Sequence, residues 1–325
     1  MIKIAYSPTL LLVVLVCALY AAPAHARARV FVASYGNDAN PCTFGSPCKT
    51  FQHAHDVVDV GGEVTAIDSA GFGPINITKS VTITSPDGVE AGVVPTAGGD
   101  AIEISVGPTD AVVLHGLTLN GSGVGANGIA FKGGGSLTIS NCAVHNFIYD
   151  GSHSNTGNGI LIQPTSGTVN FIVTNTTVSD NGNVALYYLP TGGGATAHGV
   201  IDHVVATNNQ FGIVLDDSGG GAAVVAIANS IASNNVLSGI ALGTVSSPLV
   251  VSIDNASVNN NPGNGISAGT NTPNSLSVLL GRSVITGNEE GVYIQGVAKV
   301  YTYQNNQINS NSADVGGALT PTTLR

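Results

Sequence analysis

The sequence predicts an all-β fold, a single-stranded right-handed parallel β-helix with three strands in each coil. Asparagines recur at intervals of 23 to 28 residues, and the same pattern of short apolar segments surrounds each of them. Charged residues make up only 9% of the chain, whereas 43 of its 325 residues are glycine, a composition that disfavours helices. A period of this length is typical of one structural unit stacked on itself. The recurring asparagines are Asn181, Asn209, Asn235, Asn261, Asn288 and Asn311.

Each repeat contains three short apolar segments with the alternation of strands that have one buried side. In one repeat these segments are residues 212–215, residues 225–227 and a third that ends at Ala232. A repeat of this length leaves no room for crossover helices between the strands. The strands of successive coils are therefore expected to pair in parallel at about 4.8 Å per step. Crossover chirality predicts the right hand.

The asparagine column predicts a stack of identical bends. Asparagine tolerates the left-handed backbone conformation, and its amide can bond to the same amide one coil away. A polar ligand-binding strip is the alternative interpretation of the column. Ladders of this kind are an ordinary stabilising device, and the structural role is therefore preferred.

Residues 1–26 have the pattern of a secretory signal peptide. Lys3 precedes an apolar run over residues 10–22, and small residues follow at Ala24 and Ala26. The run is short for a membrane span. The sequence therefore predicts a secreted or periplasmic protein with no membrane span in the mature chain.

Residues 27–75 are expected to form an N-terminal strand, a cysteine loop and a capping helix ahead of the β-helix of residues 76–325. Cys42 and Cys48 flank a turn-rich segment, and in an exported protein they are expected to form a disulfide. Within residues 49–60, Phe51, Ala54 and Val58 have helical spacing. Such a helix would cover the strand edges of the first coil.

The glycine-isoleucine repeats and the asparagine column over residues 76–317 resemble the parallel β-helix of the pectin-lyase-like superfamily. The front segments, residues 30–41 and 47–52, are similar to the opening of many secreted bacterial proteins of that group. The resemblance is specific for the fold and weak for function, because the superfamily contains lyases, hydrolases, epimerases and adhesins. It carries over no calcium carboxylates, catalytic arginine or paired-aspartate motif, since no stretch of this sequence matches them.

The charge balance argues against nucleic acid as a partner. The chain has 19 acidic and 9 basic residues, and a basic face for phosphates is absent from the pattern. No metal-binding or phosphate-binding motif occurs in the sequence. No metal site and no cofactor are therefore predicted.

Asp202, Asp216 and Asp217 are the candidates for catalysis if the chain is an enzyme. Glycoside hydrolysis requires two carboxyl groups at a suitable separation. Asp216 and Asp217 follow a predicted strand, but the positions stacked on Asp216 in neighbouring repeats hold no carboxylate. The pattern therefore gives no acid and base pair.

A mildly apolar column of outward positions on the first strand is the candidate binding surface. Leu161, Tyr187 and Tyr293 are its larger members. Stripes of this kind can bind a partner or a sugar chain, and a sheet face covered by loops is the other interpretation.

These observations favour a secreted, non-catalytic scaffold that presents a surface to an extracellular or cell-surface polysaccharide or protein. The alternative is a carbohydrate-active enzyme, a polysaccharide hydrolase or lyase. A purely structural role at the cell surface is the third possibility.

Overall fold

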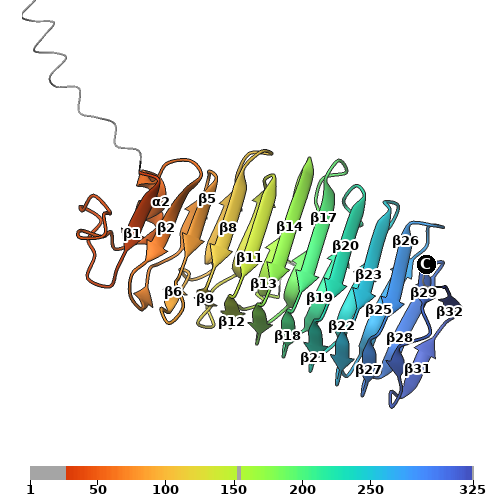
Figure 1. Ribbon diagram of the computed structural model, residues 1–325. Helices are drawn as coiled ribbons and strands as arrows, with labels where there is room; N and C mark the ends of the chain where they lie inside the picture. Colours follow the sequence, from red (N-terminus) through yellow and green to blue (C-terminus); the bar gives the residue numbers. More distant parts are fainter. Residues whose placement is uncertain (1–26, 152–154, 324–325) are drawn as a thin grey trace, which may run out of the picture.

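The repeating pattern of the sequence corresponds to successive coils of a parallel β-helix (Figure 1). The computed structural model describes residues 27–151 and 155–323. The predicted signal peptide, residues 1–26, lies outside the described residues. The described part of the chain has no helix whose length and apolarity would let it span a bilayer.

Three parallel sheets, named here in the order in which each coil visits them, run along the β-helix. Sheet 1 has 12 strands: β1 (Arg29–Val32), β2 (Gly62–Ala66), β5 (Val81–Thr84), β8 (Ala111–His115), β11 (Ser136–Ser140), β14 (Thr168–Thr174), β17 (Thr196–Asp202), β20 (Ala223–Ala228), β23 (Leu249–Asp254), β26 (Leu276–Gly281), β29 (Lys299–Thr302) and β32 (Leu319–Pro321). Sheet 2 has 10 short strands: β3 (Ala70–Gly71), β6 (Ala91–Val93), β9 (Leu117–Asn120), β12 (Ala143–His145), β15 (Thr177–Ser179), β18 (Val205–Thr207), β21 (Ile231–Ser233), β24 (Ser257–Asn259), β27 (Val284–Thr286) and β30 (Gln307–Ile308). Sheet 3 has 10 strands: β4 (Ile75–Ile77), β7 (Ile102–Ser105), β10 (Asn127–Gly133), β13 (Asn158–Ile162), β16 (Val184–Tyr188), β19 (Phe211–Asp216), β22 (Ser238–Gly243), β25 (Asn264–Thr270), β28 (Glu290–Gly296) and β31 (Ala313–Gly316).

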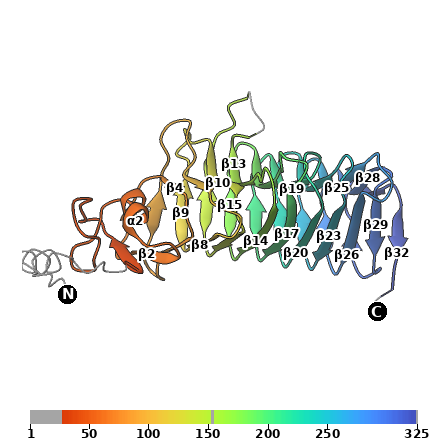
Figure 2. The ribbon, with the colours of Figure 1, turned by 90° about the horizontal axis from the view of Figure 1, so that it is seen from above.

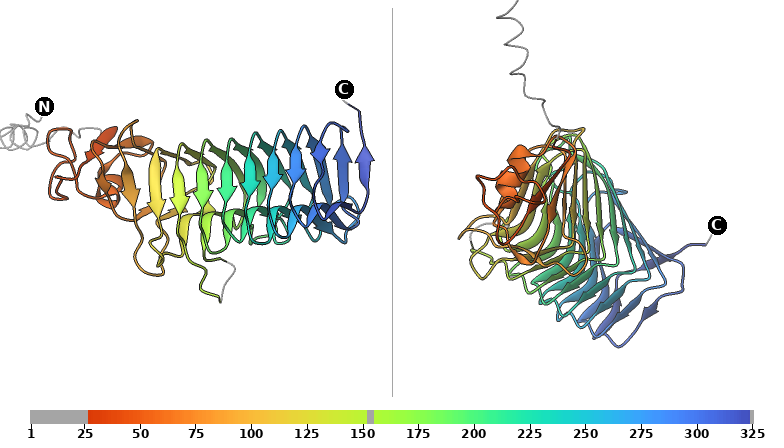
Figure 3. Two further views of the ribbon diagram at one scale, coloured as in Figure 1. Left: turned by 90° about the horizontal axis from the view of Figure 1, so that it is seen from below. Right: turned by 60° about the vertical axis from the view of Figure 1, so that its left-hand side comes forward.

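The three sheets enclose the interior of the β-helix (Figure 3). Columns of apolar side chains fill this interior and form the core. In sheet 3 the register places Leu186 beside Ile213 and Ile213 beside Ile240, and all three side chains are buried. Burying an aliphatic side chain of this size contributes about 1.5–3 kcal/mol. Identical stacking in each coil therefore gives the scaffold a continuous core without any second layer of helices.

Polar residues with left-handed backbone make the bends between sheets 1 and 2. Their φ angles lie between 48° and 55°. Asparagine adopts this conformation more readily than most residues, and its side chain can bond to nearby backbone groups. The bend residues are Asn141, Asn175, His203, Asn229, Asn255 and Arg282. The asparagines of the predicted column do not have this conformation themselves; at the bends before sheet 3 the residue that precedes each of them has the positive φ, as at Asp180, Asn208 and Asn234.

The helix α2 (Phe51–Val57) covers the first coils at the N-terminal end, which confirms the predicted capping helix (Figure 2). Thr50 caps it, since its hydroxyl accepts the His53 N–H at 3.2 Å. Phe51 packs on Phe72 with 5.0 Å between ring centroids. Sheet 1 includes β1 and β2, both of which lie before residue 76. It therefore extends on both sides of the boundary between residues 75 and 76 at which the sequence placed the start of the β-helix.

The disulfide between Cys42 and Cys48 is present, as predicted. Both cysteines are fully buried, and backbone bonds join Phe31 to each of them. The disulfide closes a small loop, which limits its stabilisation to about 2 kcal/mol in the chain-entropy treatment.

Replacing both cysteines (Cys42→Ser with Cys48→Ser) is expected to lower the free energy of unfolding by about 2 kcal/mol. Urea denaturation of the variant measures this loss. The same loss is expected for the unmodified protein in a reducing buffer, which serves as the control. An unchanged denaturation midpoint in both experiments would show that the loop is held without the disulfide.

Candidate functional site

The predicted asparagine column is a buried hydrogen-bonded ladder beside sheet 3. Asn235 donates its backbone N–H and its side-chain Nδ2 to Oδ1 of Asn261, at 3.0 and 3.1 Å. The same two bonds join Asn181 to Asn209, Asn209 to Asn235, Asn261 to Asn288 and Asn288 to Asn311. Asn235 and Asn261 are 0% exposed, so a ligand cannot reach them. The ladder is therefore structural, as the preferred interpretation of the column had it.

A carboxylate terminates the ladder at its C-terminal end. Asn311 donates its N–H and its Nδ2 to Oδ1 of Asp314, at 3.2 and 3.1 Å, in place of a further asparagine. At the other end, Oδ1 of Asn181 accepts the N–H of Phe147 at 3.2 Å. Both ends of the ladder are thus satisfied within the described residues.

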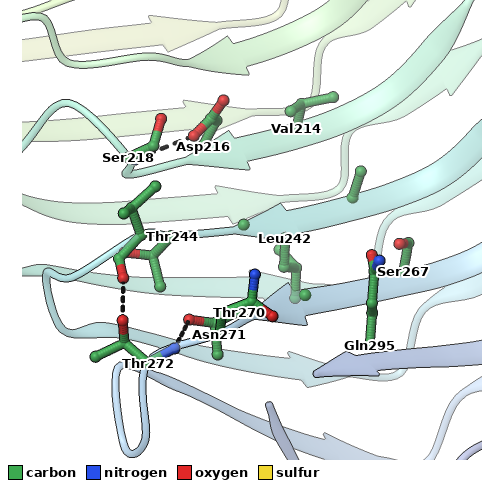
Figure 4. Close-up of a pocket in the computed structure, with 14 residues that line it drawn as sticks. Val214, Asp216, Ser218, Leu242, Thr244, Ser267, Thr270, Asn271, Thr272 and Gln295 are labelled. Carbon is green, nitrogen blue, oxygen red and sulfur yellow. Dashed lines mark hydrogen bonds between the residues drawn. The ribbon is translucent and has the colours of Figure 1, made fainter. Parts of the chain in front are cut away.

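A groove of about 500 Å³ crosses the outer face of sheet 3 over strands β19, β22, β25 and β28 (Figure 4). Small residues form its floor, and hydroxyl and amide side chains surround them. Asp216 is the one charged residue among the described residues that line it. The lining residues are Val214, Asp216, Ser218, Ala241, Leu242, Gly243, Thr244, Val245, Ser267, Gly269, Thr270, Asn271, Thr272 and Gln295.

The three turns along one edge of the groove are bonded to one another, and we call residues 217–222, 244–248 and 271–275 the rim turns. The Ser247 hydroxyl donates to the carbonyl of Gly220 at 2.5 Å. In the next coil the Thr272 hydroxyl donates to the carbonyl of Val245. Because each rim turn is bonded to its neighbour, the edge of the groove is preorganised.

Asp216 and Asp217 are adjacent in sequence, but only Asp216 faces the groove. Oδ1 of Asp216 accepts the Ser218 N–H at 3.0 Å, and the residue is partly exposed. Asp217 is 0% exposed, and neither of its carboxylate oxygens has a hydrogen-bond partner. Burial, with a smaller contribution from the charge of Asp216, raises the pKa of Asp217 to about 7.

Asp202 lies on sheet 1, at the end of β17, and so the structure does not bring it together with Asp216 or Asp217. Its carboxylate accepts Nδ2 of Asn229 at 2.7 Å and lies 2.8 Å from Nδ1 of His203. The bond from Asn229 and then the bond from His203 lower the pKa of Asp202. The three candidates for catalysis thus form no pair of carboxyl groups across a common cleft.

Leu161 is 2% exposed and cannot offer the binding surface that the sequence suggested for it. Tyr187 and Tyr293 are partly exposed, in the predicted outward column of sheet 3. Tyr187 pairs with Val214, and Tyr293 pairs with Ser267. Tyr187 therefore lies one coil before the groove, on β16, and Tyr293 lies on β28, the last strand that the groove crosses.

The outer face of sheet 1 carries an exposed aliphatic patch that was not predicted from the sequence. Ile172, Val200, Val224 and Val250 are between 41% and 49% exposed. A second groove of about 490 Å³ includes them. The patch could have been predicted from the sequence, because the outward positions of the second strand are aliphatic in several repeats.

Cys42, Cys48 and His53 form one cluster of potential metal ligands, with their ligand atoms within 4.8 Å of one another. The two sulfur atoms are joined in the disulfide, however, and are not available as thiolates. Cys142, the free cysteine of the described chain, is buried, and burial raises its pKa to about 11. It is therefore unsuited to nucleophilic chemistry.

Known structures with the same architecture include the pectate lyase Pel9A, which is 17% identical over 89% of this chain and 78% of its own, with a TM-score of 0.63. Weaker likenesses are to the GH136 lacto-N-biosidase from Eubacterium ramulus (12% identity, 91% of this chain, 68% of that chain, TM-score 0.47) and the A-module of the Azotobacter vinelandii mannuronan C-5 epimerase AlgE4 (14%, 91%, 89%, TM-score 0.43). At 17% identity the likeness to Pel9A concerns the fold alone. No curated protein matches the sequence.

A match of the sequence to a protein family supports the same architecture. Residues 103–277 match the family described as "Right handed beta helix region", and the matched region spans more than half of the 325 residues. The match agrees with the hand that crossover chirality predicted. The chain is thus a member of the right-handed β-helix family.

Proposed function

We propose that this chain is a non-catalytic scaffold that binds a polysaccharide in the groove of sheet 3. The composition of the groove carries the proposal: small residues leave an open floor, and hydroxyl and amide groups from four neighbouring coils surround it. Polar groups repeated along the axis suit a ligand that also repeats along its length. Tyr187 and Tyr293 at the two sides provide partly apolar surfaces for sugar rings.

The charge of the groove favours a neutral glycan over an acidic one. Asp216 is its charged lining residue, and the whole chain carries a formal net charge of −10. A polyuronate would bring further negative charge to this surface, which is repulsive at low ionic strength. A neutral chain would instead donate its hydroxyls to the Asp216 carboxylate.

The arrangement of the aspartates supports binding without cleavage. Hydrolysis by two carboxyl groups requires both to flank one glycosidic bond. Asp216 faces the groove, whereas Asp217 is buried and Asp202 lies on another sheet. A member of the pectin-lyase-like enzymes, a hydrolase or lyase, would need a catalytic group that these residues do not supply together.

Gly243→Tyr is expected to abolish glycan binding, or to weaken it at least about tenfold, without loss of stability. A Cβ added at Gly243 meets nothing within 4 Å, so the new ring can occupy the groove without a clash in the core. A loss of about 1.4 kcal/mol of binding free energy corresponds to the tenfold change. Titration of the protein with a panel of neutral and acidic polysaccharides measures the affinity.

Gly133→Tyr is the matched control, because Gly133 also lies in sheet 3 and also has open space around its Cβ position. It does not line the groove. Equal loss of binding in both variants would place the ligand elsewhere. Binding of no polysaccharide by the folded protein would reject the proposed function.

A further inference from the structure

Asp217 is a buried acid at the start of the first rim turn, between Asp216 at the end of β19 and Ser218 in the turn. It is 0% exposed, and both of its oxygens lack a partner. The buried hydroxyl of Tyr188, one coil earlier, also lacks a partner. Unpaired buried oxygens are costly, and a buried carboxylate is costlier still when it carries its charge. The position therefore requires a physical explanation that the groove itself does not provide.

Thr244 and Thr270, which follow Asp217 in the same corner of the next two coils, suggest how the position works. The register aligns Asp216 with Gly243 and Gly243 with Gly269, so the next residues align as well. The Thr244 hydroxyl donates to the carbonyl of Ser247 in its own turn at 2.8 Å. Thr270 accepts the N–H of Thr272 at 3.1 Å and bonds with Ser275. In both coils a side chain in this corner closes its own rim turn.

We propose that Asp217 is a positioning residue that acts as a proton-dependent latch on the rim of the groove. As a neutral acid it can donate its O–H to a carbonyl of its own turn, as Thr244 does. The equivalent acceptor is Gly220, and a carbonyl can accept a second bond beside the one from Ser247. Oδ1 of Asp217 already lies against this residue, since a Cβ built on Gly220 would be 2.4 Å from it.

As an anion, Asp217 would favour opening of the turn. The ionised carboxylate would be buried without a donor, and water can reach it only if the turn moves. Opening would displace Ser218, and with it Asp216 at the end of β19, because Oδ1 of Asp216 accepts the Ser218 N–H. Ionisation of a residue that does not line the groove would therefore alter the groove.

The groups around Asp217 favour its neutral form. The neighbouring carboxylate of Asp216 adds to the effect of burial, and together they place the pKa of Asp217 near neutrality, at about 7. Tyr188 lies on the neighbouring strand β16. Burial and the charge of Asp217 raise the pKa of its phenol, so it stays neutral. Burial and the charge of Asp216 raise the pKa of Tyr187 to about 12. Among the described residues, no lysine, arginine or histidine contributes to the shift at Asp217.

The latch predicts that the rim is closed at mildly acidic pH and opens as the pH rises through about 7. Between pH 3.8 and about 7, Asp217 keeps its proton in the folded protein but loses it in the unfolded chain, where its pKa has the ordinary value of 3.8. The stability that this proton contributes is therefore fully present below pH 3.8 and is lost as the pH rises through 7. If the closed turn binds the ligand, affinity falls up to about tenfold for each pH unit above that pKa.

Hydrogen exchange of residues 217–223 between pH 5 and 9, corrected for the intrinsic rate at each pH, tests the latch without any ligand. In the unmodified protein, protection is expected to fall above pH 7. In Asp217→Asn and Asp217→Thr, which cannot ionise, protection is expected to be independent of pH. Protection that is constant in the unmodified protein, or that falls equally in both variants, would overturn the proposal. Protection restored at high pH by calcium or sodium ions would also overturn it, in favour of a cation site.

Affinity for a glycan over the same pH range tests the part of the inference that rests on the proposed function. Binding by the unmodified protein is expected to weaken above pH 7, and binding by Asp217→Asn is expected to stay constant. If the unmodified protein binds equally well at pH 6 and pH 8.5, the link to the groove is wrong. If no glycan binds at any pH, the proposed function is wrong, while hydrogen exchange still decides whether the latch exists.

Discussion

Asn235→Ala is expected to lower the free energy of unfolding by roughly 2–4 kcal/mol. The substitution removes the acceptor of the backbone N–H of Asn209, whose bond to Oδ1 of Asn235 is 3.1 Å long. It also removes the donor to the carbonyl of Ala206, at 3.1 Å. The site is 0% exposed, so water cannot replace these bonds without disrupting the coil. Urea denaturation followed by circular dichroism measures the loss.

Asn234→Gly is the matched control, because Asn234 is the exposed neighbour of Asn235 in the same bend. Its φ of 56° is a conformation that glycine adopts without strain. A change below about 1 kcal/mol is expected for this control. If the two variants lose equal stability, the bend conformation, and not the ladder, holds the coils together.

Gly212→Ala is expected to lower the free energy of unfolding by roughly 2–4 kcal/mol. The cause is a steric conflict beside the same ladder. A Cβ at this position would be 2.3 Å from the carbonyl oxygen of Gly239 and 2.9 Å from Nδ2 of Asn235. The carbonyl belongs to the paired backbone of the next coil and cannot move away as a flexible side chain could. Ala185 occupies the equivalent position of the preceding coil, so alanine is accommodated there. The predicted loss therefore depends on the particular contacts of Gly212. The midpoint of urea denaturation measures the cost.

Gly243→Ala is the control for this substitution, since its added methyl group meets nothing within 4 Å. Its stability is expected to stay within about 0.5 kcal/mol of the unmodified protein, as for most surface substitutions. Normal stability of Gly212→Ala would indicate that the coils can separate enough to admit a methyl group.

The sequence predicted the fold well because the same physical demands recur in every coil. Each bend needs a residue that tolerates left-handed backbone, and the ladder needs an amide at one position. Glycine next to the ladder follows from the same geometry, as the clearance at Gly212 demonstrates. A residue requirement that repeats at a fixed period can be recognised in a single sequence. A requirement that occurs only once cannot be distinguished from ordinary loop sequence.

The candidate site was predicted less well, because exposure depends on parts of the chain that the repeat does not describe. Leu161 has an outward position in the repeat and is nevertheless buried. Asp216 and Asp217 were considered together, although the alternation of a strand sends successive side chains to opposite faces. Extending the alternation of β19 by one residue would have placed Asp217 inside. The rim turns that bound the groove could not be inferred, because their bonds join loops of different sequence.

Binding without turnover is tested by one experiment, which measures both the retention of a polysaccharide and its cleavage. The protein is incubated with a neutral polysaccharide that it retains, with and without calcium, and the size distribution of the recovered ligand is then measured by mass spectrometry and size-exclusion chromatography. The proposed scaffold predicts retention in the unmodified protein, weaker retention in Gly243→Tyr and ligand of unchanged length in both. Shortened or unsaturated products that disappear with Asp216→Asn would contradict it and identify the chain as a carbohydrate-active enzyme.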